Sequence, residues 1–426
     1  MHSIKQKIKK LVPAPILNWY HFFMSLLATI IFCYPSRKIK VIGVTGTNGK
    51  STVVMMVSKI LEEAGYKIAT SSSVEFQIGE KKWANNLRMT MPGRFSLQKF
   101  LRKAASKNCQ YAVVEVSSEG IKQHRHRFIN FTAAILTNVT AEHLESHGGF
   151  KNYLSAKGEL FRLNKNIHII NYEDSNFEYF AGFKAKKKYI YGIKPKNEKN
   201  KTVFVLFPGQ LKNLTEGSMF NLNGLEFKLN LLGEFNIYNA LSAICLGLSQ
   251  NISLETCKNA LVKIKSMSGR MEQVISKPIK VFIDYAVTPD SLEKAYLTLK
   301  NNFQEKRLIC ILGSCGGGRD KWKRPILGKI ASKYCDKIII TNEDPYDENP
   351  VKIINEIAEE NKLAEKIIDR REAIHKALKS AKDGDVVIIT GKGTENSMCL
   401  DHGKKIDWND KRVVIEEFKK ISEQFN

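Results

Sequence analysis

Cysteine is scarce in this chain, and its spacing indicates neither a metal cluster nor a disulfide framework. The eight cysteines, at 33, 109, 245, 257, 310, 315, 335 and 399, include no CxxC pair. A zinc ribbon needs such pairs, and a small secreted domain needs cysteines at close, regular spacing. We therefore expect a chain that works in a reduced, cytoplasmic compartment.

Acidic residues are also in short supply, with 43 Asp and Glu against 67 Lys and Arg, which gives a net charge of +24. Such a charge favours nucleic acid binding where the basic residues cluster. Here they are scattered, with short runs only at 5–10 and 184–188, which is typical of a solvated basic surface. We expect no nucleic acid partner, although anionic substrates or a membrane surface would be attracted.

Charge is missing altogether from residues 16–34, an apolar stretch just long enough to cross a bilayer as a helix. No small-residue cleavage site follows it, which argues against a cleaved signal peptide. Its polar members Asn18, His21, Ser25 and Thr29 recur every three or four residues and would form one stripe on a helix. Two alternatives stay open: contact with the inner face of a membrane, or docking on the following domain.

Internal repeats and low-complexity linkers are absent, and 426 residues with 43% hydrophobic content suit two or three domains. Apolar runs at 41–45, 111–116 and 133–137 indicate strands, and 51–64 indicates a helix that Gly65 terminates. A β-rich interval follows at 187–232, and then a helix from about 236. This alternation predicts an α/β fold with a mostly parallel sheet and a β-rich appendage.

A second alternating series begins near residue 269 and indicates a smaller, Rossmann-like C-terminal domain. Its strands are expected at 280–285, 307–312, 337–341 and 385–390. We therefore expect a basic and apolar helical segment at 1–38, a central domain at 39–268 and a C-terminal domain at 269–426.

The most informative motif is GVTGTNGKST at 43–52, between an apolar run and a helical stretch. Backbone N–H groups of such a turn, the positive end of the following helix and the Lys50 ammonium converge on polyphosphate, while Ser51 is placed to bind Mg²⁺. The loop departs from the usual spacing, because Val44 stands where a glycine is common and Gly46 is the nearest upstream glycine. The motif predicts a phosphate cradle with a bound metal.

Three further residues carry chemistry once a phosphate loop is present. Glu115 ends an apolar run, where a P-loop enzyme needs a carboxylate for its metal; the alternative is a strand-end Glu in solvent. His143 follows a strand, and Lys157 lies in YLSAKGE. Taken alone, His143 is typical of a structural histidine and Lys157 of a surface lysine.

Taken in order, the motifs resemble those of the Mur ligases, ATP-dependent amide-bond-forming enzymes of bacterial cell-wall synthesis, over residues 39–426. The shared strings are GTNGKST (46–52), EVSS (115–118), TN (137–138), HLESHG (143–148), AK (156–157), GEFNIYN (233–239) and GRME (269–272). Three more are similar to the branch that adds the third amino acid, the UDP-N-acetylmuramyl-tripeptide synthetases: DYAVTPDSL (284–292), GGGRDKWKRP (316–325) and GKGTE (391–395).

The resemblance implies that ATP phosphorylates a carboxylate and that an amine then attacks the acyl phosphate, with metal ions and cations stabilising the charge. It assigns the β- and γ-phosphates to Lys50, a first Mg²⁺ to Ser51, and a second Mg²⁺ to Glu115 and His143. Lys157 matches the lysine that the family carbamylates into a metal ligand. The resemblance also implies which residues contact ATP. The phosphates would meet the loop and Arg270, the adenine would meet Asn236 and Asn239, and the ribose side would meet Asp284. The loop residues are Gly46, Thr47, Asn48, Gly49, Lys50, Ser51 and Thr52.

The amino acid and the acceptor are implied to meet Thr90, Arg319, Asp344, Tyr346, Gly391 and Glu395. Arg319 would grip the α-carboxylate of the amino acid, and Glu395 would meet an amino group. The diaminopimelate-adding enzymes carry Asp-Asn-Pro-Arg where this chain has Glu-Asp-Pro-Tyr at 343–346, so the arginine clamp for a second carboxylate is missing. We expect a single-carboxylate amino acid, with lysine favoured by the negative charge of Asp344.

The front of the chain departs most from the family. Only about forty residues precede the phosphate loop, where the family carries a UDP-binding domain, so we expect that domain to be absent. The acceptor is then a peptidoglycan precursor that carries UDP, a lipid or neither. Val287 also stands where the family usually has His. We expect a monomer whose two nucleotide-type domains close over ATP.

Two other functions remain as alternatives. Folylpolyglutamate synthase shares the phosphate loop, but it lacks the string at 319–325. A P-loop ATPase that acts on nucleic acid or at a membrane would explain the basic charge, but it leaves Lys157 and the Arg319 segment without a role. Phosphate release that depends on an added amino acid separates these classes.

Overall fold

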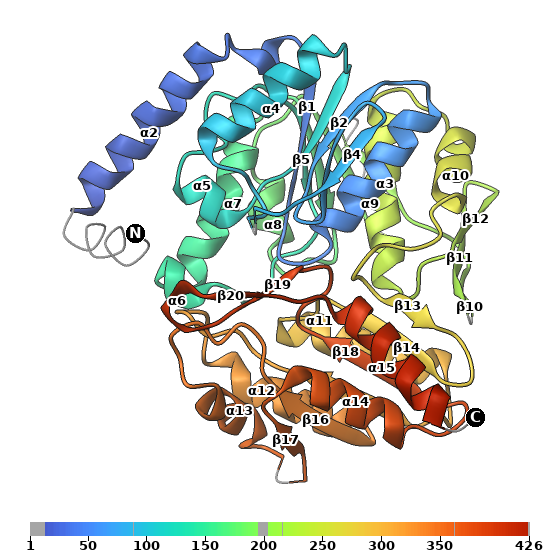
Figure 1. Cartoon of the computed structure of the whole chain (residues 1–426). Helices are drawn as coiled ribbons and strands as arrows, with labels where there is room; N and C mark the ends of the chain where they lie inside the picture. Colours follow the sequence, from blue (N-terminus) through green and yellow to red (C-terminus); the bar gives the residue numbers. More distant parts are fainter. Residues whose placement is uncertain (1–12, 88, 195–202, 215, 362, 425–426) are drawn as a thin grey trace.

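The computed structural model describes residues 13–87, 89–194, 203–214, 216–361 and 363–424 (Figure 1). It contains a nine-stranded sheet in the order β4-β3-β2-β5-β1-β6-β7-β8-β9. Every neighbouring pair is parallel except the pairs that β3 forms with β2 and with β4. The strands are β1 (Lys40–Thr45), β2 (Ile68–Ser71), β3 (Glu75–Ile78), β4 (Lys81–Ala84), β5 (Tyr111–Glu115), β6 (Phe131–Leu136), β7 (Ile167–Asn171), β8 (Lys187–Tyr191) and β9 (Val203–Leu206).

Helices cover both faces of this sheet, as a parallel sheet buried on both sides requires. Ile42 and Val44 of β1 pack with α3, α9 and α10, whereas Val41 packs with α4, α7 and α8 on the other face. The helices are α3 (Lys50–Glu63), α4 (Arg94–Ser106), α5 (Ser118–Lys122), α6 (Leu144–His147), α7 (Phe150–Leu163), α8 (Phe177–Ala181), α9 (Phe235–Ser249) and α10 (Leu254–Val262). The helix predicted at 51–64 is confirmed as α3, with Gly65 at a positive φ of 84° just beyond it.

The β-rich interval continues the sheet and then forms a small sheet of its own. β8 and β9 extend the nine-stranded sheet, and β10 (Leu211–Leu214), β11 (Gly217–Leu222) and β12 (Leu225–Leu229) form an antiparallel sheet. Phe220 and Phe227 stack across β11 and β12 and join the core on the α3 side. We call residues 40–262 the central part.

The C-terminal part, residues 272–424, is built on a six-stranded sheet in the order β13-β14-β18-β15-β16-β17. Its strands are β13 (Glu272–Ile275), β14 (Lys280–Asp284), β15 (Leu308–Leu312), β16 (Lys337–Thr341), β17 (Glu365–Ile367) and β18 (Val386–Thr390). Only β13 is antiparallel, at the edge. The helices are α11 (Pro289–Asn302), α12 (Lys323–Tyr334), α13 (Pro350–Ala358), α14 (Arg370–Ser380) and α15 (Asp410–Gln424).

The predicted α/β architecture is confirmed, and the parallel strands of both sheets lead into one shared region. A hairpin of β19 (Ser397–Cys399) and β20 (Lys405–Asp407) lies near the junction of the two parts (Figure 1). The boundary that the sequence places near residue 268 falls between α10 and β13. Loops at the carboxyl ends of parallel strands commonly form ligand sites.

The apolar stretch at 16–34 forms most of α2 (Ala14–Ile31), which lies on the outside of the central part beside α4 (Figure 1). Three of the four residues of the polar stripe face the protein, because His21, Ser25 and Thr29 are buried, whereas Asn18 is exposed. No helix in the ranges that the structure describes is long and apolar enough to cross a membrane. The docked alternative therefore matches the packing of α2.

Candidate active site

A cavity of about 1000 Å³ lies between the central and C-terminal parts. Residues that follow β1 and β6, together with Glu115 at the end of β5, line it on one side, and residues at or after the ends of β14 and β15 line it on the other. Three of the expected site residues, Gly46, Lys157 and Gly391, are not in this lining. The others that line it are Thr47, Asn48, Gly49, Lys50, Ser51, Thr52, Thr90, Glu115, His143, Asn236, Asn239, Arg270, Asp284, Arg319, Asp344, Tyr346 and Glu395.

The phosphate loop joins β1 to the first residue of α3, which is Lys50. Glycine is required at Gly46 and Gly49, which have φ values of 150° and 83°. A Cβ at Gly46 would lie 1.8 Å from Thr137 Oγ1. Lys50 Nζ donates hydrogen bonds to the carbonyls of Gly46, at 3.0 Å, and Thr47, at 2.8 Å. The lysine thus folds over a loop whose backbone N–H groups and helix end suit a polyphosphate.

Two residues after β6 hold the loop in shape. Thr137 Oγ1 donates to the Asn48 carbonyl at 2.6 Å. Asn138 pairs with the Asn48 backbone twice, because its Oδ1 accepts from Asn48 N at 3.0 Å and its Nδ2 donates to Asn48 O at 3.1 Å. The sequence supplied both residues in a family string but gave them no role, since only the parallel pairing of β1 and β6 brings them beside the loop.

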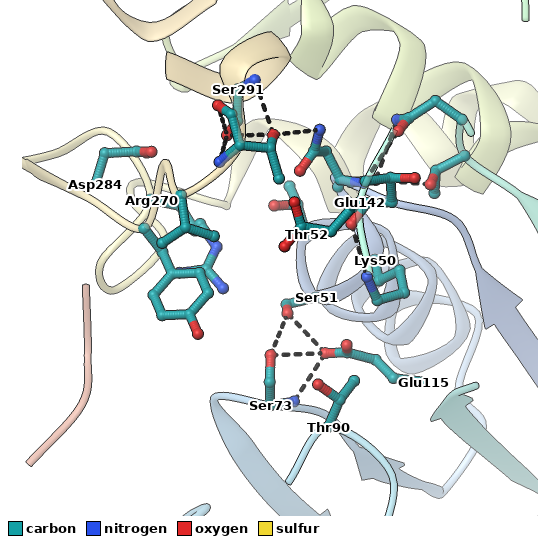
Figure 2. Close-up of a pocket in the computed structure, with 18 of the residues that line it drawn as sticks. Lys50, Ser51, Thr52, Ser73, Thr90, Glu115, Glu142, Arg270, Asp284 and Ser291 are labelled. Carbon is teal, nitrogen blue, oxygen red and sulfur yellow. Dashed lines mark hydrogen bonds between the residues drawn. The ribbon is translucent and has the colours of Figure 1, made fainter. Parts of the chain in front are cut away.

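A carboxylate and two hydroxyls meet below Lys50 (Figure 2). Glu115 Oε1 accepts from Ser51 Oγ at 2.6 Å and from Ser73 N at 2.8 Å, and the two serine hydroxyls are 2.8 Å apart. Glu115 Oε2 is buried and has no hydrogen-bond partner. A buried carboxylate oxygen without a partner is costly in protein alone. The unpaired oxygen beside a hydroxyl fits a hard cation such as Mg²⁺.

Replacing Glu115 by Gln is expected to lower the rate of ADP formation by about a hundredfold and to raise the Mg²⁺ concentration needed for half-maximal rate. The amide keeps the shape of the side chain but removes its charge. Glu119→Gln is the matched control, because Glu119 lies four residues on and pairs with His147 and Ser146 instead. Mg²⁺ titrations of both variants test this, and equal titrations would refute the metal role of Glu115.

Lys157 lies behind the phosphate loop and is buried. Its Nζ donates to the Gly46 carbonyl at 2.6 Å and lies 4.6 Å from the centroid of the Tyr153 ring. Burial, reinforced by the neighbouring Lys50 charge, holds the pKa of Lys157 well below its ordinary value. The structure therefore contradicts the surface-lysine alternative, because Lys157 is an enclosed amine whose burial disfavours the charged form.

His143 lines the cavity at the start of α6. Burial first, and then Arg319 and Lys157, lower the pKa of His143 to about 3. The imidazole is thus neutral at pH 7 and has a lone pair for a metal or a hydrogen-bond donor. No group of three or more His, Cys, Asp or Glu side chains in the described ranges is arranged to hold a metal.

The nucleotide side of the cavity has contributions from both parts of the chain. Asn236 and Asn239 of α9 are buried, and Asn239 Nδ2 donates to Asn236 Oδ1 at 3.0 Å. The guanidinium of Arg270 lies 4.6 Å from the centroid of the Tyr285 ring (Figure 2). Asp284 Oδ2 accepts from Met271 N at 2.7 Å, and burial raises the pKa of Asp284 to about 6, against the effect of Arg270.

The expected amino-acid side contains one cation that the sequence analysis did not single out. Lys392 is fully buried, and its Nζ contacts Asp344 at 2.8 Å and Glu395 at 2.5 Å. Asp344 also accepts from Cys399 N at 2.7 Å. The expectation that the charge of Asp344 is open to a cationic substrate is therefore corrected, because Lys392 neutralises it in part.

Tyr346 and Gly391 have different positions relative to the cavity. Tyr346 lines it and packs on Gly317, where an added Cβ would lie 2.7 Å from the ring. Gly391 has a φ of 109°, and a Cβ there would lie 2.3 Å from Glu343 Oε2. Gly391 therefore does not line the cavity, but its lack of a side chain lets Glu343 pack against the backbone there.

Several polar contacts join the two parts across the cavity. Lys323 Nζ lies 3.1 Å from Glu142 Oε1, and both side chains are buried. Asp320 accepts from Leu144 N at 3.2 Å and from Glu145 N at 3.1 Å. Asn48 of the phosphate loop donates to Asp290 Oδ2 at 3.0 Å. The structure thus has the two parts in direct contact around the site.

Known proteins with similar sequences or folds were compared with this chain. The chain is 37% identical over 407 residues to a UDP-N-acetylmuramoyl-L-alanyl-D-glutamate--2,6-diaminopimelate ligase from Syntrophomonas wolfei, covering 92% of this chain and 81% of the relative. A solved structure of a ligase with the same name is 26% identical, with a TM-score of 0.61, over 91% of this chain and 79% of the other.

A solved folylpolyglutamate synthase from Mycobacterium tuberculosis has a TM-score of 0.70 at 16% identity, over 89% of this chain and 96% of the other. That identity is low enough for the likeness to concern the fold alone. Two family models match the chain. The Mur ligase middle domain covers residues 44–247 and the Mur ligase glutamate ligase domain covers residues 269–393. The chain therefore belongs to the Mur ligase family of ATP-dependent, ADP-forming amide ligases.

Proposed function

We propose that this chain uses ATP to join an amino acid to a peptide carboxylate of a peptidoglycan precursor, through an acyl phosphate. The observation that carries the proposal is that one cavity is lined both by the phosphate loop and by Arg319 and Glu395, with Lys392 paired to Glu395 behind the lining. A phosphorylated carboxylate formed at the loop would therefore lie within reach of an amine bound on the other side.

The residues of the chain divide the reaction between two ends of the cavity. At one end, Lys50 and the N-terminus of α3 hold the phosphates and stabilise the charge of the transferred group. Ser51 and Glu115 would hold Mg²⁺, which supplies Lewis acidity on the phosphate oxygens when bound. At the other end, Arg319 orients the α-carboxylate of the amino acid, so that its amine faces the acyl carbon.

The acceptor is proposed to enter on the Thr90 side, since Thr90 lines the cavity near Glu115 (Figure 2). Enclosure of the acyl phosphate by both parts of the chain keeps water away from it. We propose that the protein acts as a monomer in the cytoplasm, with α2 directed to the inner face of the membrane. We also propose that the working enzyme binds ATP together with two Mg²⁺ ions.

A substrate screen tests the function. ADP release would be measured with each free amino acid in turn and with muramyl-dipeptide precursors that carry UDP, a lipid or neither. ADP formation is expected only when an amino acid and a precursor are both present. Release that depends on glutamate and a folate, or on nucleic acid, would contradict the proposal.

Breaking the ion pair between Lys323 and Glu142 is expected to impair closure of the two parts. Burial raises the pKa of Glu142 even beside Lys323, so its charge depends on that partner. Lys323→Met leaves a buried carboxylate uncompensated, which costs about 3–5 kcal/mol in the closed form. We expect kcat/KM to fall by about a hundredfold or more, and X-ray scattering with an ATP analogue and both substrates to show a larger radius of gyration than for the wild type.

The control is Lys333→Met, because Lys333 and Glu293 form an exposed pair within the C-terminal part. The double variant Glu142→Gln/Lys323→Met removes both charges and is expected to recover most of the loss. If Lys323→Met and Lys333→Met give the same kcat/KM and the same radius of gyration, the prediction that the ion pair between Lys323 and Glu142 supports closure is wrong.

A further inference from the structure

Helix α2 is oriented opposite to a normal surface helix, since most of its polar stripe faces the protein and its apolar side chains face outward. Surface helices usually place the apolar stripe on the core. Here Ile16, Trp19, Phe23, Leu27 and Ile30 are 59%, 60%, 55%, 45% and 49% exposed. Their spacing of three or four residues puts them on one side of the helix.

Specific polar contacts hold the inward face of α2 against the central part and so determine the orientation of the helix. His21 Nδ1 lies 2.6 Å from Arg94 Nη2 at the start of α4, and Asn18 Oδ1 lies 2.7 Å from His124 Nε2. The hydroxyls of Ser25 and Thr29 donate to carbonyls one turn earlier in the helix, both at 2.9 Å. Turning the helix over would break these contacts and expose both hydroxyls.

The outward face has the composition of a surface that lies in a lipid headgroup layer. Residues 14–31 contain no Asp, Glu, Lys or Arg. Trp19 and Tyr20 are 60% and 52% exposed near the start of the helix, and these two residue types favour the boundary between water and lipid. An apolar stripe of this length lying in the plane of the membrane is typical of interfacial helices.

The sequence that flanks the helix on either side carries charge of one sign only. The first acidic residue of the chain is Glu62, whereas residues 1–40 include six lysines and one arginine. Arg37 and Lys38 are exposed just after the helix. Arg94 borders it and forms no ion pair within the described ranges, while its guanidinium lies 5.7 Å from the Tyr20 ring. Basic residues that border an apolar face attract anionic lipid headgroups.

We propose that the outward face of α2 docks in the plane of a bilayer rich in anionic lipid, with the surrounding Lys and Arg on the lipid phosphates. The helix lies on the membrane and does not span it. The charge complementarity selects this occupant over a second copy of the chain, because two such faces would bring the exposed Arg37 and Lys38 of each copy together. This docking needs no substrate and so stands apart from the proposed ligase activity.

Sedimentation of the full chain with vesicles tests the proposal. The vesicles contain phosphatidylglycerol mixed with phosphatidylcholine, or phosphatidylcholine alone. The chain is expected to bind the anionic vesicles at least about tenfold more tightly, since each basic residue near the surface adds to the attraction. Trp19→Glu/Phe23→Glu is expected to weaken that binding by about tenfold or more, because it places two carboxylates in the docking face.

The matched control is Leu363→Glu/Val351→Glu, which changes two exposed apolar residues, 95% and 45% accessible, in the C-terminal part. It is expected to leave vesicle binding unchanged. ADP formation with soluble substrates is expected to be equal in both double variants, which shows that they fold. Equal binding to both vesicle types, equal loss in both variants, or a wild-type dimer that only Trp19→Glu/Phe23→Glu dissociates would overturn the proposal.

Discussion

Replacing Lys157 by alanine is expected to lower kcat by about 10²- to 10³-fold, the scale seen when one stabilising group is lost from a charged transition state. The neutral fraction of this buried amine allows reaction with CO₂, which forms an N–C bond and releases one proton. The carbamate turns a cation into an anion that suits a metal next to the neutral His143. Its remaining N–H can still donate to the Gly46 carbonyl, which lies 2.6 Å from Nζ.

Three measurements separate this role from simple packing. With ¹³C-bicarbonate, a carbamate resonance is expected in the wild type and in Lys151→Ala, and no such resonance in Lys157→Ala. Lys151 is the matched control because it is an exposed lysine on the same helix, α7. Short carboxylic acids are expected to restore part of the activity of Lys157→Ala. Full activity of that variant in low bicarbonate would contradict the prediction.

The second large effect concerns the amine: lysine is expected to exceed meso-diaminopimelate in kcat/KM by about a thousandfold. Tyr346 lines the cavity and offers no charge to a second carboxylate. Asp344 and Glu395, which both contact the ammonium of Lys392, add two carboxylates to the region that a second carboxylate would enter. A buried carboxylate without a partner costs several kcal/mol, and this cost sets the expected ratio.

Competition between the two amino acids measures this ratio directly. Tyr346→Arg is expected to shift it toward diaminopimelate by about tenfold or more, because a guanidinium binds a carboxylate with two hydrogen bonds. Tyr346→Phe is the matched control, since it keeps the ring and adds no charge. Preference for diaminopimelate in the wild type, which the relative from Syntrophomonas wolfei carries in its name, would show that the distal carboxylate is bound elsewhere.

The sequence predicted seven of the parallel strands, β1, β5, β6, β14, β15, β16 and β18, because each is a short apolar run that ends next to a turn or a functional residue. β1, β14, β15, β16 and β18 lie within one residue of the expected positions at both ends. Strands β2, β3, β4, β7 and β17 were not predicted. Short strands of mixed polarity, such as the four exposed residues of β4, carry little periodic signal.

Two features could not be predicted because they depend on contacts between residues far apart in the sequence: the contact between Lys392 and Asp344, and the orientation of α2. Lys392 lies 48 residues from Asp344, and only the arrangement of β16 and β18 brings the two together. Periodicity predicted the polar stripe of α2, but the rule that apolar faces turn inward would have oriented the helix the other way. The contacts with Arg94 and His124, which lie far along the chain, decide the orientation.

An oxygen-transfer experiment tests the central claim most directly. A precursor labelled with ¹⁸O in its acceptor carboxylate would be turned over with ATP and the preferred amino acid, and the released phosphate analysed by mass spectrometry. The carboxylate attacks the γ-phosphorus and releases ADP. The amine then attacks the acyl carbon, and the phosphate that leaves keeps one oxygen of the carboxylate. We predict one ¹⁸O per phosphate released; unlabelled phosphate, at equal yield of the amide, would contradict the acyl phosphate.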